Sequence, residues 1–105
     1  MIKECKELLK KGGKESNILV VSSIEGSSPT PEIGVYAMTK SALNNMVVWM
    51  ATELREDDIR INSISPGLIA TEFSGILWKE NKDLNKKRLG TSEQIASVAA
   101  TMCSQ

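Results

Sequence analysis

The stretch ILVVSSIEGSSPTPEIGVYAMTKSAL, residues 18–43, predicts a strand, a loop and the start of a helix, in that order. The strand is the apolar run from Ile18 to Val21, which has the composition of a strand buried on both faces of a parallel sheet. The loop that follows is rich in Gly, Pro and Ser, and Gly34 opens the helix. This order indicates one unit of an α/β fold.

The remaining sequence extends the same alternation of helices and strands. An amphipathic helix is expected before the first strand, and Gly12-Gly13 ends it. A T-x-x-Q capping box at Thr91 is expected to start the last helix, which runs through Met102. The expected elements are helix 2–11, strand 18–21, helix 34–56, strand 59–64, a short helix or flap at 73–84, and a helix after Thr91.

Three side chains in the opening stretch have the chemistry of a carbonyl-reducing site. Tyr36 and Lys40 are four residues apart, so they share one face of the predicted helix. A phenol with a pKa of about 10 exchanges protons slowly at neutral pH unless a positive charge stabilises its anion. Lys40 would supply that charge. Ser23, 13 residues before Tyr36, would hydrogen-bond a substrate carbonyl oxygen.

Each of these residues also has an ordinary structural interpretation. A tyrosine and a lysine four residues apart occur by chance in many helices, with the ring half-buried and the lysine reaching solvent. Ser22 and Ser23 alone would simply be the polar end of a strand. The order of the parts is more specific: apolar strand, Ser-Ser, loop, Tyr/Lys helix, second strand and then Pro66-Gly67.

From Asn17 to about Ser104 the chain resembles the short-chain dehydrogenases/reductases. The resemblance is carried by ILVVSSIEG, VYAMTKSAL, IRINSISPGLIATEF and LGTSEQIASVAATMCS. Within that family, PGLIATEFSGILW and RLGTSEQIA are most similar to the NADP-dependent carbonyl and retinal reductases of the member-4 type.

The resemblance implies a role for each matching residue. Tyr36 matches the general acid/base, Lys40 matches the residue that activates it and binds the nicotinamide ribose, and Ser23 matches the substrate-orienting serine. The turn that passes beside the nicotinamide matches Pro66, Gly67, Ile69 and Thr71.

The implied fold is α/β, a partial Rossmann-like, doubly wound parallel sheet in a single partial domain spanning residues 1–105. The family's glycine-rich T-G-x-x-x-G-x-G turn, which receives the pyrophosphate, does not occur in this sequence. We therefore expect the chain to lack the N-terminal dinucleotide-binding half, the catalytic asparagine and the last strand. Glu25 also stands where the family generally has a small residue.

Two functional hypotheses follow from the resemblance. The first is an oxidoreductase that uses NADP, with NAD as the alternative cofactor, on a small carbonyl or alcohol substrate. The apolar residues from Phe73 to Trp78 would then line its substrate pocket. The alternative is that they only pack against the rest of the protein. The second is a truncated, catalytically inactive relative that acts only by pairing with another subunit.

Composition limits the binding partners and the cellular location that we expect for this protein. With 13 basic and 13 acidic residues, the net charge is zero, which gives no reason to expect nucleic acid or a membrane surface as partner. The absence of histidine excludes a histidine triad, and no metal site is expected. Cys5 and Cys103 are expected to be free thiols in a reducing compartment. The expected location is therefore intracellular, in the cytoplasm, with the peroxisome and the mitochondrion as alternatives.

The family also implies a homo-oligomer formed through helix 34–56. Apolar residues of this helix are spread over more than one stripe, as a helix covered on more than one side requires. The alternative that stays open is cover by another part of the same chain.

Overall fold

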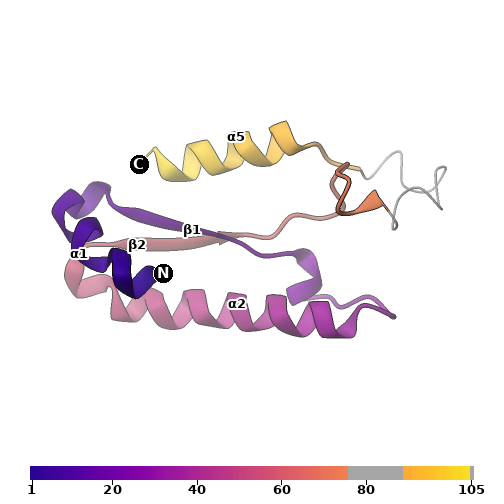
Figure 1. The fold of residues 1–105 in the computed structure, drawn as a ribbon, viewed down its shortest axis with the longest axis horizontal. Coiled ribbons are helices and arrows are strands. Elements are labelled where there is room, and N and C mark those ends of the chain that lie inside the picture. Colours follow the sequence, from indigo (N-terminus) through magenta and orange to yellow (C-terminus); the bar gives the residue numbers. More distant parts are fainter. Residues whose placement is uncertain (76–88, 105) are drawn as a thin grey trace.

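Two parallel strands lie between helices in the computed structural model, which describes residues 1–75 and 89–104 (Figure 1). Strand β1 (Asn17–Val21) pairs with β2 (Arg60–Ile64) in parallel, with Asn17 opposite Arg60 and Val21 opposite Ile64. Helix α2 (Gly34–Glu53) covers one face of the strands and α5 (Ser92–Cys103) lies along the other. The expected α/β class with helices on both faces is confirmed.

The first helix, α1 (Ile2–Gly12), lies at the end of the molecule where the two strands begin (Figure 1). Its half-buried Ile2 and Leu9 pack against the core, while Lys3, Glu4, Glu7 and Lys11 are exposed. Gly13 ends the helix with φ 53°, a left-handed conformation that glycine adopts without strain. The predicted helix 2–11 is therefore confirmed, one residue longer than expected.

The predicted helix 34–56 was too long. The α-helix ends at Glu53, and the chain continues into the 3₁₀ turn η3 (Arg55–Asp57) and a left-handed residue, Asp58. This reversal lets both Leu54 and Ile59 face inward, where they are 2% and 3% exposed. An uninterrupted helix would have carried Ile59 away from the core, so tertiary packing sets this boundary.

The core lies between α2 and the sheet, and it consists of Val47, Leu54, Ile59 and Ile61. The apolar strand at 18–21 contributes less than predicted. Ile18 and Val20 are half-buried and Val21 is 54% exposed, so burial on both faces was wrong. The physical reason is that, within the described residues, β1 has a neighbouring strand on one edge only.

The capping box before the last helix is confirmed. The Thr91 hydroxyl accepts a hydrogen bond from the Gln94 amide at 3.3 Å, and the Gln94 side chain accepts one from the Thr91 amide at 2.9 Å. The helix or flap predicted at 73–84 falls, beyond Gly75, outside the described residues. In the described ranges, no helix has the length and apolar character needed to cross a membrane.

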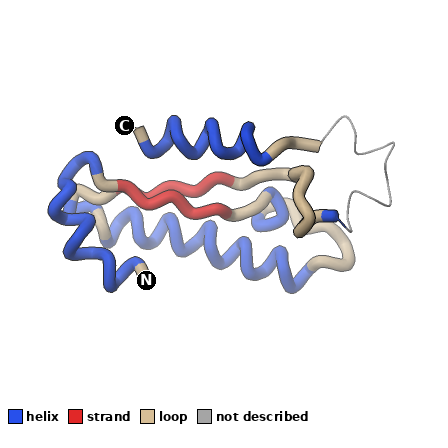
Figure 2. The backbone as a smooth tube through the Cα atoms, turned by 45° about the horizontal axis from the view of Figure 1, so that its top comes forward, coloured by secondary structure: helices blue, strands red, loops and turns tan. Residues whose placement is uncertain are grey.

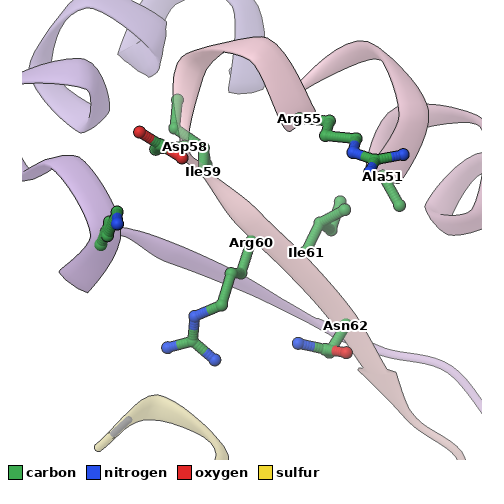
Figure 3. Close-up of a pocket in the computed structure, with 8 residues that line it drawn as sticks. Ala51, Arg55, Asp58, Ile59, Arg60, Ile61 and Asn62 are labelled. Atoms are coloured by element: carbon green, nitrogen blue, oxygen red, sulfur yellow. The ribbon is translucent and has the colours of Figure 1, made fainter.

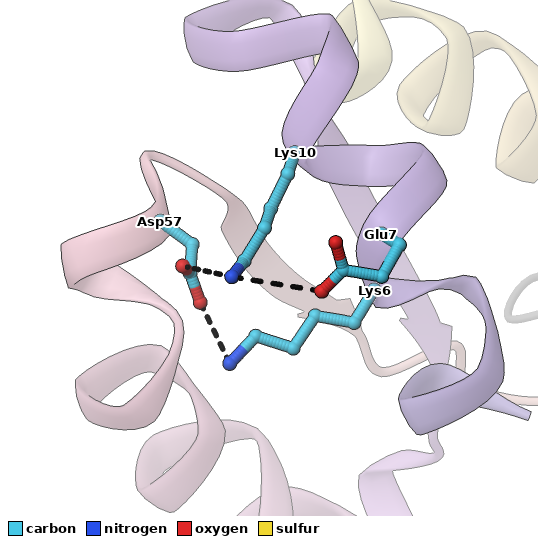
Figure 4. Close-up of polar contacts among 4 residues, drawn as sticks. All are labelled: Lys6, Glu7, Lys10 and Asp57. Carbon is cyan, nitrogen blue, oxygen red and sulfur yellow. Dashed lines mark ion pairs between the residues drawn. The ribbon is translucent and has the colours of Figure 1, made fainter.

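An ion cluster joins α1 to η3 (Figure 4). The Asp57 carboxylate contacts Lys6 Nζ at 2.7 Å and Lys10 Nζ at 3.0 Å, and Lys10 also lies 3.7 Å from Glu7. Hydrogen bonds from Lys6 and Lys10 hold the pKa of Asp57 below its ordinary value. Because α1 buries none of its side chains completely, this cluster is a principal attachment of the helix to the rest of the chain.

We expect Asp57→Asn to lower the melting temperature at pH 7. A carboxyl group with a lowered folded-state pKa stabilises the fold above its unfolded pKa, and this contribution is lost as the pH falls through the folded pKa. Melting curves followed by circular dichroism from pH 7 to pH 2.5 should therefore converge for the wild type and the variant at the acid end. The matched control is Asp58→Asn, because Asp58 is exposed and its left-handed backbone suits asparagine. A constant difference between the wild type and Asp57→Asn at every pH would contradict the assignment.

Candidate active site

The carboxyl ends of both strands and the start of α2 meet at one end of the molecule (Figure 2). Beyond β1, the Ser22 amide donates to the Ile64 carbonyl at 2.8 Å, and the Ile24 amide donates to the Pro66 carbonyl at 3.0 Å. The two chains leaving the sheet are therefore still bound together where Ser23 and Pro66 lie. Crevices beyond the carboxyl ends of parallel strands are the usual ligand sites of such folds.

Ser23 is 7% exposed and caps the 3₁₀ turn η2 (Ile24–Gly26). Its Oγ accepts a hydrogen bond from the Glu25 amide at 3.2 Å. Within residues 1–75 and 89–104, no acceptor takes the hydroxyl proton of Ser23. The hydroxyl therefore has one side fixed by the protein and a proton available to a ligand oxygen.

Turn η2 rests directly on helix α2. A Cβ added to Gly26 would lie 2.7 Å from Asn44 Nδ2 and 2.9 Å from the carbonyl carbon of Lys40, so only glycine permits this approach. The Ser41 hydroxyl donates to the Gly26 carbonyl, and the Ser22 hydroxyl donates to the Lys40 carbonyl at 3.3 Å. The backbone that carries Ser23 is thereby fixed to the helical turn that carries Lys40.

Lys40 and Tyr36 lie together on α2, as their spacing predicts. Lys40 Nζ lies 5.5 Å from the centre of the Tyr36 ring, within the range of a cation–π interaction. The same ammonium donates a hydrogen bond to the Val21 carbonyl at 3.1 Å, at the end of β1. Both side chains are partly exposed, so a ligand can reach them.

The turn after β2 contains the four other predicted residues. Pro66 binds η2 through its carbonyl, and Gly67 lies beside the Ile24 side chain. Ile69 forms an isolated parallel bridge with Gly90. The Thr71 hydroxyl lies 3.2 Å from the Ser74 hydroxyl and accepts a hydrogen bond from the Ser74 amide at 3.3 Å. The structure therefore holds Pro66 and Gly67 against η2, and it places Thr71 in a local turn with Ser74.

Sequence reasoning missed several residues that build this site. The hydroxyl groups of Ser22 and Ser41 hold η2 on α2, and Asn44 lies close to Gly26. Glu25, noted in the sequence only as a departure from the family, contacts both Ser23 and the following loop. Asn44 had a readable signal, because it continues the four-residue spacing from Tyr36 and Lys40. Its Oδ1 is buried without a hydrogen-bond partner in the described part of the chain. The Ser22–Lys40 and Ser41–Gly26 contacts join residues 18 and 15 positions apart and leave no local pattern.

A separate groove of about 510 Å³ lies beside β2 (Figure 3). It is lined in part by Lys14, Arg55 and Arg60. Figure 3 shows Arg55 extending from turn η3 and Arg60 extending from β2 in a different direction, so their guanidinium groups do not converge on one ligand. None of the predicted site residues lines this groove, so we assign the chemistry to the strand ends instead.

The site suits the nicotinamide and ribose end of a dinucleotide. The Lys40 ammonium has three N–H donors, of which the Val21 carbonyl takes one, leaving donors for ribose hydroxyl groups. The Ser23 hydroxyl can donate to a carbonyl oxygen beside it. The sequence contains no glycine-rich turn for the pyrophosphate, so these residues fit only one end of the cofactor.

Comparison with known proteins gives consistent results. The family model described as enoyl-(acyl carrier protein) reductase matches residues 1–105. "Dehydrogenase/reductase SDR family member 4" of Bos taurus is 37% identical over 106 residues, which cover 94% of this chain and 37% of the relative. The chain thus spans little more than a third of the length of this curated relative.

Two solved structures are similar to the fold. "4-hydroxyisoleucine dehydrogenase complexed with NADH" aligns with a TM-score of 0.84 and 28% identity, over 98% of this chain and 45% of that one. BdcA in complex with NADPH aligns with a TM-score of 0.79 and 28% identity, over 89% of this chain and 40% of that one. The nicotinamide cofactors belong to those proteins.

We expect Gly26→Ala to weaken the attachment of η2 to α2. The new Cβ would overlap the Lys40 backbone, which cannot move as a flexible side chain can, so we expect a loss of about 1–3 kcal/mol in the free energy of unfolding. Urea denaturation followed by circular dichroism measures it. Gly34→Ala is the matched control, since a Cβ there meets nothing within 4 Å. Equal stability of the two variants would argue against a close contact at Gly26.

Proposed function

Because this chain belongs to the short-chain dehydrogenase/reductase family, we propose that it carries the catalytic half of an NADP-linked oxidoreductase acting on ketones, aldehydes or the corresponding alcohols. The observation that supports this best is the buried Ser23 hydroxyl, fixed on its acceptor side, on a turn bound to the helix of Tyr36 and Lys40. Those three side chains provide a hydrogen-bond donor, a proton donor and a positive charge.

In the proposed reaction each side chain has one task. A bound nicotinamide would supply the hydride to the carbonyl carbon. Ser23 donates a hydrogen bond to the carbonyl oxygen and orients it, and Tyr36 gives that oxygen its proton, so that an alcohol results. Lys40 stabilises the phenolate left on Tyr36 and holds the ribose. Alcohol oxidation is the reverse of these steps.

The cofactor preference is proposed from the relatives. We propose NADP from the resemblance of the sequence to NADP-dependent reductases of the member-4 type. One similar structure holds NADH and another holds NADPH, so NAD is the alternative. We propose that the turn containing Pro66, Gly67, Ile69 and Thr71 passes beside the nicotinamide. Its attachment to η2 through the Pro66 carbonyl supports this position.

A second function is favoured by one observation. The sequence lacks the glycine-rich pyrophosphate turn, so the chain alone offers no site for that part of a dinucleotide. On this alternative, the chain is an inactive relative that acts only by pairing with another subunit.

We also propose a homo-oligomer in which α2 of one copy packs against α2 of another. Val35, Met38, Val48 and Trp49 of this helix are 58–73% exposed. A hollow of about 580 Å³ lies at the start of the helix, lined by Pro29, Val35 and Met38 among others. Met38 lies four residues after the start of α2, and Trp49 lies four residues before its end. If two copies of α2 pair antiparallel about their midpoints, the Trp49 indole of one copy therefore lies opposite the hollow at Met38 of the other.

The other proposed partners are limited to small molecules, because the chain has no net charge to attract nucleic acid or a membrane. Cys5 and Cys103 are both exposed and unpaired, which supports an intracellular location. The cytoplasm is proposed, with the peroxisome and the mitochondrion as alternatives.

The first test is a titration of the 105-residue chain with NADPH and with NADH, following nucleotide fluorescence while circular dichroism monitors folding. Saturable binding is expected, with NADPH bound more tightly. Tyr36→Phe should keep that binding and lower kcat for carbonyl reduction by about 10²- to 10⁴-fold, because the proton donor is lost. Thr52→Val, which removes an exposed hydroxyl near the other end of the same helix, should leave kcat unchanged. A folded chain that binds neither nucleotide would favour the inactive relative.

The oligomer is tested by sedimentation velocity at micromolar concentration. We expect a dimer for the wild type, and for Trp49→Ala a dissociation constant raised about 10- to 100-fold, because an indole filling a hollow is a typical interface anchor. Leu8→Ala is the control, since Leu8 is 67% exposed but lies on α1. A monomeric wild type would contradict the proposed interface.

A further inference from the structure

The part of the loop that follows turn η2, residues 29–32, has few hydrogen bonds. Pro29 and Pro31 have no N–H group to donate. In the described part of the chain, the only hydrogen bonds of residues 29–32 are two from Thr30 to Glu25. The position of Thr30 in this loop therefore depends on its contact with Glu25.

In that pair both oxygens of the Glu25 carboxylate are occupied. Oε2 accepts the Thr30 amide at 2.6 Å and Oε1 accepts the Thr30 hydroxyl at 2.7 Å. Short hydrogen bonds to a charged acceptor are stronger than neutral ones. We call this pair of bonds the Glu25–Thr30 clasp; it closes the loop at residues 25–30.

The clasp holds a strained segment. Glu32 has φ 76°, a positive value that strains the backbone of a residue with a side chain. Such a residue keeps its conformation only when its surroundings determine it. Glu32 lies between the clasp at Thr30 and the start of α2 at Gly34, so those two points fix its backbone.

Glu25 also contacts the serine. Its backbone amide donates to Ser23 Oγ, while its side chain carries the clasp. Because the Ser23 oxygen accepts the Glu25 amide on one side, the Ser23 hydroxyl hydrogen is directed away from that amide. This is the orientation in which Ser23 can donate a hydrogen bond to a carbonyl oxygen. A change at the Glu25 carboxylate can therefore reach Ser23 through a single residue.

We propose that Glu25 is a positioning residue whose clasp with Thr30 fixes both the loop before Tyr36 and the direction of the Ser23 hydroxyl. Its role in turnover rests on the proposed function, whereas its role in fixing the Ser23 turn does not. Holding a reacting group within a fraction of an ångström is worth large rate factors, so loosening the clasp lowers turnover without removing any group that touches substrate.

Amide hydrogen exchange by NMR on the 105-residue chain tests the positioning. Glu25→Gln keeps the size of the side chain but removes its charge and one acceptor. We expect exchange at residues 25, 26 and 30 to become about tenfold faster, as loss of about 1.4 kcal/mol from a charged hydrogen bond implies. The amides of strand β2 should exchange as in the wild type, which shows that the variant folds.

Two variants of Thr30, which binds the Glu25 carboxylate, complete the test. Thr30→Val keeps the amide donor but loses the hydroxyl, so exchange should become faster by less than in Glu25→Gln. Thr30→Ser keeps both donors, so its amides should exchange as in the wild type. Faster exchange at residue 30 alone, with residues 25 and 26 unchanged, would overturn the proposal, because the clasp would then not reach Ser23. No change at any of the three would overturn it as well.

Kinetics separate this proposal from the proposed function. In an active chain, Glu25→Gln should lower kcat about tenfold with little change in KM, and Thr30→Ser should match the wild type. Unchanged kcat despite faster exchange would overturn the role in turnover. An inactive wild type would count against the proposed function, and the exchange results would still decide whether Glu25 positions Ser23.

Discussion

The site depends on the parallel pairing of β1 and β2. Parallel strands require the chain to return along the full length of the sheet, and α2 makes that return. As a result the helix begins at the same end of the sheet where both strands finish (Figure 1). For this reason Ser23, the Tyr36–Lys40 pair and Pro66 lie at the same end of the sheet. Only Tyr36 and Lys40 are close to each other in the sequence. An antiparallel arrangement would have put Ser23 and Pro66 at opposite ends.

The second requirement is the close contact between η2 and α2. Gly26 allows the two backbones to approach, and Ser22 and Ser41 provide hydrogen bonds across the contact. Lys40 contributes twice, since its backbone packs against Gly26 and its ammonium binds the Val21 carbonyl. A residue proposed to assist Tyr36 and to hold the ribose thus also holds the end of β1, so replacing Lys40 would disturb structure as well as chemistry.

How far the sequence predicts this structure depends on whether the signal is local. The order of elements and the Thr91 cap follow from patterns within a few residues, and the spacing of Tyr36 and Lys40 correctly puts them on one face of α2. The predicted end of α2 was wrong because Leu54 and Ile59 turn inward. There they fill a core that includes Ile61 of β2. The Ser41–Gly26 and Ser22–Lys40 bonds span 15 and 18 residues, and no local pattern indicates them. The catalytic roles of Ser23, Tyr36 and Lys40 stay predictions, since geometry alone does not test them.

The exposed apolar residues of α2 bear on both functional hypotheses. The helical period places Tyr36, Lys40 and Asn44 on the side facing η2, whereas Met38 and Trp49 lie on roughly the opposite side. This division explains why α2 has apolar residues all round yet buries only Ala37 and Val47 completely. A second copy packed against Met38 and Trp49 would leave the Tyr36–Lys40 face open to cofactor and substrate. The proposed pairing and the proposed catalysis would therefore use different faces of one helix, so a chain that had lost catalysis could still keep pairing.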